Sequence, residues 1–167
     1  MFSVTYPQRK SHRLTHWDYA QNGYYYITIC TQNRRGLFSE IRQCGLDAQV
    51  IPTTIGQIVL RHWYSLPAIY PGVHTDCICL MPNHIHGILI LEQAPDQPAR
   101  SLSQVVRGFK SVVTREYNQL VPPQQRNRLW QSSFYDEIIR NDEMLYDIRK
   151  YIMGNPSKWL DDPLFIK

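Results

Sequence analysis

The chain has 167 residues, a length typical of one domain, since single domains mostly contain about 100 to 200 residues. With 43% hydrophobic and 19% charged residues it can bury a core, which excludes wholesale disorder. No apolar run reaches the ~18 residues that a membrane-spanning helix needs, and the first residues lack the pattern of a signal peptide. We therefore expect a soluble, cytoplasmic protein.

The net charge of +4 is a weak indication of polyanionic partners. Arginines and lysines recur along the whole chain among twenty aromatic residues, eleven of which are tyrosine. Cationic groups near flat rings suit single-stranded nucleic acid, whose phosphates attract charge and whose bases stack. The alternative is that the tyrosines fill a small core while the arginines are solvated, and composition alone favours it.

Hydrophobic periodicity and breaker residues predict an alternation of strands and helices. The predicted elements are a strand at Tyr24–Thr31, a helix at Thr54–Leu66, strands at Val73–Leu80 and His84–Leu91, a helix at Ser101–Gln119, a short strand or extended arm at Leu129–Phe134, and a last helix capped by Asn141 and ended by Gly154 and Pro156. Met81-Pro82-Asn83 joins two of the strands as a hairpin. This order predicts an α+β sandwich with a mostly antiparallel sheet, built as a single domain over residues 1–167.

The sharpest local signal is His84-Ile85-His86. Side chains alternate along a strand, so histidines two positions apart present both imidazoles on one face. In an otherwise apolar strand these polar rings need partners. A divalent metal ion or a hydrogen-bond network satisfies them equally well.

A second signal lies in the last predicted helix, where Tyr151 and Asn155 are one turn apart on one face. Tyr151 borders the apolar stripe of this helix, so one interpretation is a core or boundary tyrosine. The functional interpretation is a nucleophile. A phenol has a pKa near ~10, so it needs a nearby cation or base at neutral pH, and a metal ion on the scissile phosphate supplies part of that need. Asn155 offers an oxygen ligand from the same helix.

With these residues in place, the chain resembles the REP-associated tyrosine transposases, single-tyrosine transposases of the HUH endonuclease superfamily. The resemblance runs nearly end to end and is most specific at MPNHIHG (Met81–Gly87) followed by Tyr151-Ile152 and Asn155-Pro156. Further matching segments are Arg9–Leu14 with Asp18-Tyr19, Tyr26–Arg34, Phe109–Ser111 with Thr114-Arg115, Leu129–Gln131, Ile139–Asn141 and Trp159.

The resemblance implies a ferredoxin-like fold and a Mg²⁺ or Mn²⁺ ion held by His84, His86 and Asn155. The last is the least secure, because relatives of the insertion-sequence branch often carry glutamine there. Tyr151 is implied as the nucleophile that cleaves single-stranded DNA near a hairpin, leaving a 5′-phosphotyrosine and a free 3′-hydroxyl before transfer. The family pattern gives no role to Tyr117, a competing nucleophile. The implied protein acts as a monomer or a homodimer.

Several side chains are candidates for DNA contact, although any one of them is more often a solvated charge or a core ring. They are Arg9, Lys10 and Arg13 in a basic N-terminal arm (about residues 1–20), and Arg34, Arg35, Lys110, Arg115, Trp130 and Arg140 beyond it. Tyr135 and Trp159 are further candidates for base stacking, and all three rings are equally compatible with a core position.

Two alternatives stay open. The first alternative is a structural zinc site, with Cys77 and Cys79 on one strand of the hairpin and His84 and His86 on the other. Its weakness is that these four ligands lie nearly in line, which makes a poor tetrahedron. We expect these cysteines, with Cys30 and Cys44, to be reduced. The other alternative is a domesticated DNA-binding protein without cleavage, but such a descendant has no need for both histidines and Tyr151.

Overall fold

The computed structural model describes residues 21–45, 47–92 and 100–165. Its strands are β1 (Gly23–Cys30), β2 (Ser39–Cys44), β3 (Asp47–Pro52), β4 (Val73–Leu80), β5 (His84–Leu91) and β6 (Tyr135–Ile139). Its helices are α1 (Thr54–Tyr64), α2 (Leu66–Ile69), α3 (Leu102–Leu120) and α4 (Asp142–Gly154), with 3-10 turns η1 (Gln32–Arg34), η2 (Pro123–Gln125) and η3 (Pro156–Asp161).

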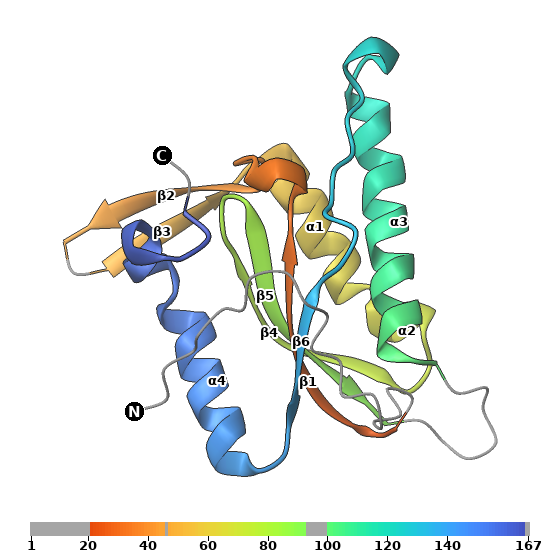
Figure 1. Ribbon diagram of the computed structural model, residues 1–167, viewed down its shortest axis with the longest axis vertical. Coiled ribbons are helices and arrows are strands. Elements are labelled where there is room, and N and C mark those ends of the chain that lie inside the picture. The colour runs from red at the N-terminus through yellow and green to blue at the C-terminus, as the bar shows by residue number, and fades with distance from the viewer. Residues whose placement is uncertain (1–20, 46, 93–99, 166–167) are drawn as a thin grey trace.

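A four-stranded antiparallel sheet in the order β4-β5-β1-β6 forms the middle layer (Figure 1). Helices α1 and α3 cover one face, and α4 covers the other. Without the β2–β3 hairpin and the short α2, the chain runs β-α-β-β-α-β with the strand order of a ferredoxin-like fold, and α4 follows on the second face. The predicted α+β sandwich with a mostly antiparallel sheet is confirmed.

Strand β1 shows why the sheet separates two hydrophobic clusters. Tyr25, Ile27 and Ile29 pack against α1 and α3, while Tyr26 and Thr28 face the side of α4. This alternation follows from the two-residue period of a strand. The face toward α1 and α3 is wholly apolar, whereas the face toward α4 also holds polar groups and is therefore the place to look for chemistry.

Side-chain caps define the helix starts. Asn141 accepts a hydrogen bond from the Met144 N–H at 2.8 Å, which confirms it as the N-cap of α4. Ser101 and Gln104 form a reciprocal capping box at the start of α3. The caps fix where α4 begins, and therefore which of its residues turn toward the sheet.

Two segments differ from the predicted elements. The β2–β3 hairpin was not predicted, because β2 is largely polar and the apolar alternation in β3 is short and ends at Pro52. The strand or arm expected at Leu129–Phe134 is not a strand: Trp130 makes one isolated bridge to Thr31, and the paired strand begins at Tyr135. In the part of the chain that the structure describes, no helix is long and apolar enough to cross a bilayer, and Cys30, Cys77 and Cys79 are free thiols.

Gly87 follows the two histidines because the sheet leaves it no room for a side chain. A Cβ at this position lies 2.6 Å from two atoms of the Trp63 indole, which is fully buried and cannot move away. A Cβ at Gly154 meets nothing within 4 Å.

We therefore expect Gly87→Ala to lower the free energy of unfolding by about 1–3 kcal/mol and the Tm by roughly 5 °C, through overpacking against Trp63. Thermal unfolding followed by circular dichroism measures the change, and Gly154→Ala is the matched control with a Tm near that of the wild type. Equal Tm values for the two variants contradict the proposed contact.

Candidate active site

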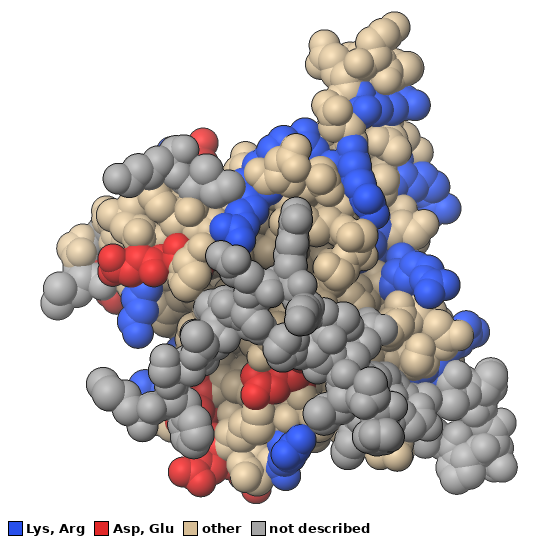
Figure 2. Space-filling model, viewed as in Figure 1, with Lys and Arg blue, Asp and Glu red and all other residues tan. Residues whose placement is uncertain are grey.

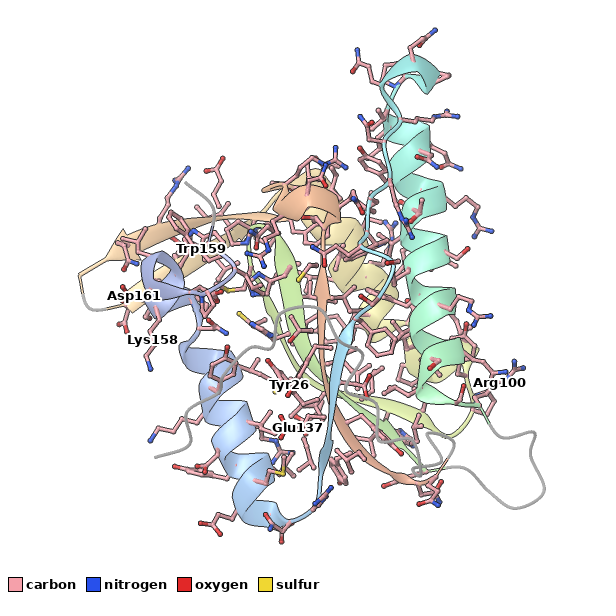
Figure 3. All side chains as sticks on the ribbon, in the orientation of Figure 1. Tyr26, Arg100, Glu137, Lys158, Trp159 and Asp161 are labelled. Carbon is pink, nitrogen blue, oxygen red and sulfur yellow. The ribbon has the colours of Figure 1, made fainter. Side chains whose placement is uncertain are left out.

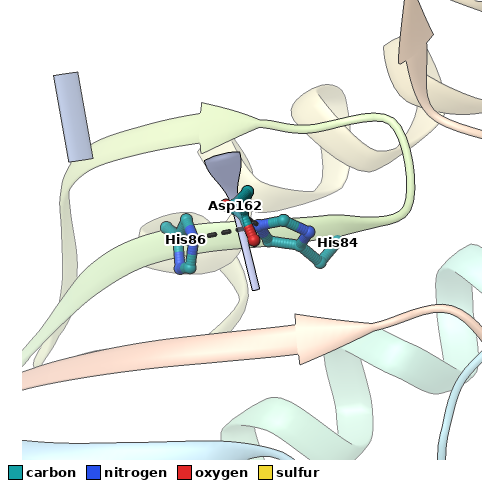
Figure 4. Close-up of side chains that lie close together, drawn as sticks. All are labelled: His84, His86 and Asp162. Carbon is teal, nitrogen blue, oxygen red and sulfur yellow. Dashed lines mark hydrogen bonds and ion pairs between the residues drawn. The ribbon is translucent and has the colours of Figure 1, made fainter. Parts of the chain in front are cut away.

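The two histidines lie on the same face of β5 and are completely buried (Figure 4). The Nε2 atoms of His84 and His86 are 2.9 Å apart, and both rings turn toward the side of the sheet that α4 covers. This arrangement confirms that histidines two positions apart on this strand share one face. Two ring nitrogens thus meet in an interior without solvent.

The tautomer of His84 is fixed by Asn83. The Asn83 Nδ2 donates a hydrogen bond to the Leu164 carbonyl at 2.7 Å, so its other side-chain atom is the oxygen, which only accepts. His84 Nδ1 lies 2.7 Å from that oxygen and must donate to it. The Nε2 of neutral His84 therefore carries a lone pair directed at the site.

The other ring has partners of both kinds. His86 Nδ1 lies 2.8 Å from the Tyr26 hydroxyl and 2.8 Å from the Thr28 hydroxyl. Hydroxyl groups donate or accept, so this pair supports either tautomer of His86. Figure 3 shows Tyr26 between the sheet and α4. These supporting residues follow from the alternation of β1 and from the pairing of Thr28 with His86, neither of which the sequence analysis used.

Asp162, just after η3, supplies a carboxylate that the sequence analysis missed. Its Oδ2 lies 3.8 Å from His84 Nε2 and has no hydrogen-bond partner among the described residues, while Oδ1 accepts from the Leu164 N–H at 2.6 Å. One ligand atom from each of His84, His86 and Asp162 lies within 4.8 Å of the others, a grouping that can hold a metal ion. No local pattern around Asp162 marks it, because only the fold brings it to the histidines.

Burial sets the protonation of this group. It lowers the pKa of His86 to about 3 and that of His84 well below its usual range, where the neighbouring His86 and Arg34 act in the same direction. Burial also raises the pKa of Asp162, against the effects of the Leu164 N–H and Arg34. The site therefore keeps both imidazoles neutral, which is the state that binds a cation.

Tyr151 reaches this site from α4. Its ring centroid lies 5.5 Å from that of His86 and 6.3 Å from that of Tyr26. Burial raises the pKa of the phenol, a hydrogen bond with Asn155 lowers it, and the charge of Asp162 raises it. The structure thus brings Asn155 beside Tyr151, and Asp162 beside His84.

Tyr117 is not placed to compete. It is 4% exposed and belongs to the cluster between α1, α3 and the sheet, on the face opposite the histidines. The structural zinc alternative is not supported either. Cys79 pairs in register with His86, but its Sγ contacts the Met81 Sδ at 3.5 Å. Among the described residues, the group that can hold a metal ion consists of His84, His86 and Asp162 and includes neither Cys77 nor Cys79.

The basic candidates lie in different places. Arg34 is the last residue of η1, and Arg35 follows it. The Arg34 guanidinium donates to the Pro163 carbonyl, and the Arg35 guanidinium donates to the Arg128 carbonyl. Figure 2 shows lysine and arginine side chains gathered over η1 and along α3, whereas acidic side chains lie toward α4 and the β2–β3 hairpin. Lys110 donates to two backbone carbonyls near the end of the connector between α3 and β6, and burial lowers its pKa to about 8.

The remaining candidates are less close. Arg115 is exposed on α3. Arg140 follows Ile139, which pairs with Tyr24 at the start of β1, whereas His84 pairs with Cys30 at the end of β1. Tyr24 and Cys30 are about 20 Å apart at about 3.3 Å per residue, so Arg140 lies far from His84. Arg9, Lys10 and Arg13 lie outside the described residues.

The structure corrects the candidate ring at Trp130. This side chain is 3% exposed and packs against Phe38 and Phe109, so it belongs to the core and is not available to stack on a base. Trp159 is half-buried beside His84, with ring centroids 6.1 Å apart, and Tyr135 is half-buried against Tyr26.

With this geometry known, comparison with known proteins shows the family. The family model described as "Transposase IS200 like" matches residues 69–155, which include both histidines and Tyr151. An uncharacterized protein of Haemophilus influenzae is 33% identical over 178 residues, covering 95% of this chain and 93% of that protein. A putative REP-associated tyrosine transposase of the same organism is 26% identical over 144 residues, covering 84% of this chain and 74% of the relative.

A solved REP-associated tyrosine transposase bound to a REP hairpin has the same fold, with a TM-score of 0.60 and 23% identity over 82% of this chain and 68% of that chain. The fold of this chain is therefore that of a transposase structure. The chain is a member of the IS200-like transposase family, with REP-associated tyrosine transposases among its relatives. Membership gives it a transposase-like role in DNA processing.

The low pKa values of the histidines predict how stability depends on pH. Below about pH 6.5 the unfolded chain binds protons on His84 and His86 that the folded chain excludes, so the free energy of unfolding falls as pH decreases, by up to about 1.4 kcal/mol per pH unit for each histidine. Urea denaturation in EDTA between pH 7 and pH 5 measures this slope.

We expect His86→Gln to reduce the slope and His74→Gln, which removes an exposed histidine, to leave it unchanged. The same slope in His86→Gln and the wild type contradicts the buried neutral state.

Proposed function

We propose that this transposase is a metal-dependent enzyme that cleaves and rejoins single-stranded DNA through a covalent bond to Tyr151. One observation carries the proposal: the Tyr151 ring lies 5.5 Å from His86, on the same face of the sheet as a second imidazole and a carboxylate. All of these groups come from one chain, which supports action by a monomer, although a homodimer remains compatible with the same site.

The donor set suits a divalent cation. His84 and His86 offer nitrogen lone pairs, and Asp162 offers a buried oxygen without a hydrogen-bond partner among the described residues. Carboxylate oxygens suit Mg²⁺ and Mn²⁺, and two imidazoles favour Mn²⁺ over Mg²⁺. Asn155, beside Tyr151, is a further oxygen donor in this proposal. A cation held by these residues would supply charge neutralisation at the scissile phosphate.

Within this site Tyr151 is the nucleophile. Its phenolic oxygen forms the new bond to phosphorus and gives up its proton to water, while the bond from phosphorus to the 3′ oxygen breaks. The leaving oxygen takes up a proton from water and becomes a free 3′-hydroxyl, so no net proton is gained or lost. Burial raises the pKa of the phenol, so Tyr151 is protonated before the substrate binds. Attack of another 3′-hydroxyl on the phosphotyrosine reverses the reaction, so rejoining needs no nucleotide cofactor.

The proposed substrate is single-stranded DNA beside a hairpin. The solved relative is bound to a REP hairpin, and the basic side chains over η1 and α3 offer phosphate contacts here. We propose Arg34, Arg35, Lys110, Arg115 and Arg140 for such contacts, with Arg9, Lys10 and Arg13 in an N-terminal arm of a single 1–167 domain. Such a substrate is cytoplasmic in a bacterium, and we expect the protein there.

We expect Tyr151→Phe to abolish covalent capture of DNA, because the phenylalanine ring keeps the packing but has no oxygen to attack phosphorus. Incubation with Mn²⁺ and hairpin oligonucleotides, followed by mass spectrometry of protein–DNA adducts, measures capture. Tyr146→Phe, on the exposed face of the same helix, is the matched control and should still be captured. If Tyr151→Phe traps DNA as well as the wild type, Tyr151 is not the nucleophile; if no protein traps DNA although all bind it, the non-cleaving DNA-binding alternative is favoured.

Asp162→Asn tests the carboxylate. Replacing it by an amide removes the negative charge facing His84, so we expect Mn²⁺ affinity to fall at least about tenfold, measured by isothermal titration calorimetry on metal-free protein. Asp161→Asn removes the exposed charge next to it and should bind Mn²⁺ like the wild type. Equal loss in the two variants would mean that overall charge, and not ligation by Asp162, controls the affinity.

A further inference from the structure

A second polar site lies between η1 and the connector that joins α3 to β6. We infer that this site binds one nucleotide of the single-stranded DNA, holding its base with side-chain amides and its phosphate with arginine. The inference rests on the proposed function. It adds a second position, away from the scissile phosphate, at which the protein binds the DNA strand.

The site is a pocket of about 350 Å³ lined by Gln32, Asn33, Arg35, Asn127 and Arg128. Its volume is at the small end of ligand pockets, which matches a single nucleotide better than a larger ligand. Every lining residue has a polar or cationic side chain, and the carbon atoms of these side chains also face the pocket. Hydrogen-bonding groups and positive charge together suit a base with its phosphate.

The backbone of η1 is held in an unusual conformation at this pocket. Asn33 and Arg34 are consecutive non-glycine residues with positive φ, at 56° and 52°. Asparagine tolerates this region, but arginine rarely adopts it. Such conformations persist where the surrounding structure enforces them and gather at ligand-binding segments.

Three arginine contacts enforce this conformation. Arg35 donates from Nη2 to the Arg128 carbonyl at 2.8 Å and from Nε to the Gln32 carbonyl at 3.4 Å, which joins η1 to the connector. Arg34 donates to the Pro163 carbonyl at 3.3 Å, which joins η1 to the segment that carries Asp162. The walls of the pocket are therefore set before any ligand enters.

The cationic side chains around the pocket form no direct ion pairs with carboxylates among the described residues. Four such cations lie in or beside the pocket: Arg34, Arg35, Arg128 and Lys110. Arg34, Arg35 and Lys110 donate hydrogen bonds to uncharged backbone carbonyls. Arg128 contributes to the lowered pKa of Lys110, which shows that like charges lie near one another. A phosphate group relieves this repulsion.

The amides are positioned to read a base. Gln32 Nε2 donates to Asn33 Oδ1 at 3.1 Å, which leaves the Asn33 Nδ2 turned away from Gln32 as a donor. Asn127 Nδ2 donates to the Gln125 carbonyl at 3.1 Å, two residues earlier in the connector, which leaves its side-chain oxygen as an acceptor. The residues that line the pocket therefore include one amide donor and one amide acceptor, a pair that can bond the edge of a nucleobase.

Hydrogen bonds link the η1 segment of the pocket to the candidate active site. Thr31, just before η1, donates its N–H to the Asn83 carbonyl at 2.9 Å, and Asn83 in turn orients His84. The charge of Arg34 also acts on both His84 and Asp162. The pocket and the candidate active site are therefore built on bonded neighbouring segments of the chain.

The test measures binding of fluorescein-labelled DNA to the full chain by anisotropy. The probes are a mixed-sequence single-stranded 12-mer, the same backbone without bases, and the blunt duplex of that sequence. Asn33→Gly removes the amide and accepts the positive φ, and Arg128→Gln removes the charge but keeps the carbonyl that Arg35 binds. Arg126→Gln is the matched control, an exposed arginine two residues away and outside the pocket lining.

We expect Asn33→Gly to weaken binding of the 12-mer about fivefold and to leave binding of the base-free strand unchanged. Arg128→Gln should weaken both about five- to tenfold and lower the slope of log affinity against log salt by about 0.7. Arg126→Gln should preserve the preference for the 12-mer over the base-free strand. The Tm of Asn33→Gly should equal or exceed that of the wild type, because glycine relieves the backbone strain.

The inference is overturned if Asn33→Gly and Arg128→Gln bind all probes as Arg126→Gln does. It is also overturned if Asn33→Gly has a lower Tm than the wild type, because the Asn33 amide would then have a structural role. If those variants fail in this way while the wild type still forms its adduct with Mn²⁺, the proposed function stands without the pocket. A wild-type chain that binds no single-stranded probe overturns both.

Discussion

The site depends on two imidazole nitrogens that face each other at 2.9 Å in the dry interior of the protein. Buried polar atoms are costly unless they are paired. The Nε2–H tautomer of His86 satisfies the His84 lone pair by donating to it, whereas the Nδ1–H tautomer directs both lone pairs at one point. The surrounding groups define what can enter between the rings: Asn83 directs the His84 lone pair inward, and Asp162 adds a negative oxygen. A cation meets all of these demands at once.

The fold arranges this by giving the two faces of one sheet different tasks. The face toward α1 and α3 is filled with apolar side chains and supplies most of the buried surface. The other face carries the histidines, Tyr26 and Thr28, and is closed by α4 with its tyrosine. The residues that stabilise the fold and the residues of the candidate site therefore lie on opposite faces of the same sheet. Along β5, alternate side chains point to one face or the other.

Much of this could be predicted from the sequence, because the signals are local. The alternation in β5 places His84 and His86 on one face, and the cap at Asn141 begins the helix that presents Tyr151. The strand order required the family resemblance as well as the pattern, since element order alone is compatible with other sandwiches. The family membership of the chain confirms that resemblance.

The rest could not be predicted, because it depends on contacts between distant segments. Asp162 reaches His84 only after the chain turns back at η3, and Trp130 is buried because Phe38 and Phe109 converge on it. The apolar alternation of the β2–β3 hairpin is too short for periodicity to reveal it. The local sequence pattern does not predict the role of a residue whose contacts come from distant parts of the chain.

The bond between Asn83 and the Leu164 carbonyl spans 81 positions of the chain. Closing so long a loop has an entropic cost, so this contact belongs to the late stages of folding rather than to the nucleus. Local opening of the segment after α4 would break it without disturbing the sheet. Competence for chemistry is then a more fragile property than the folded state, and on gentle heating it should disappear first.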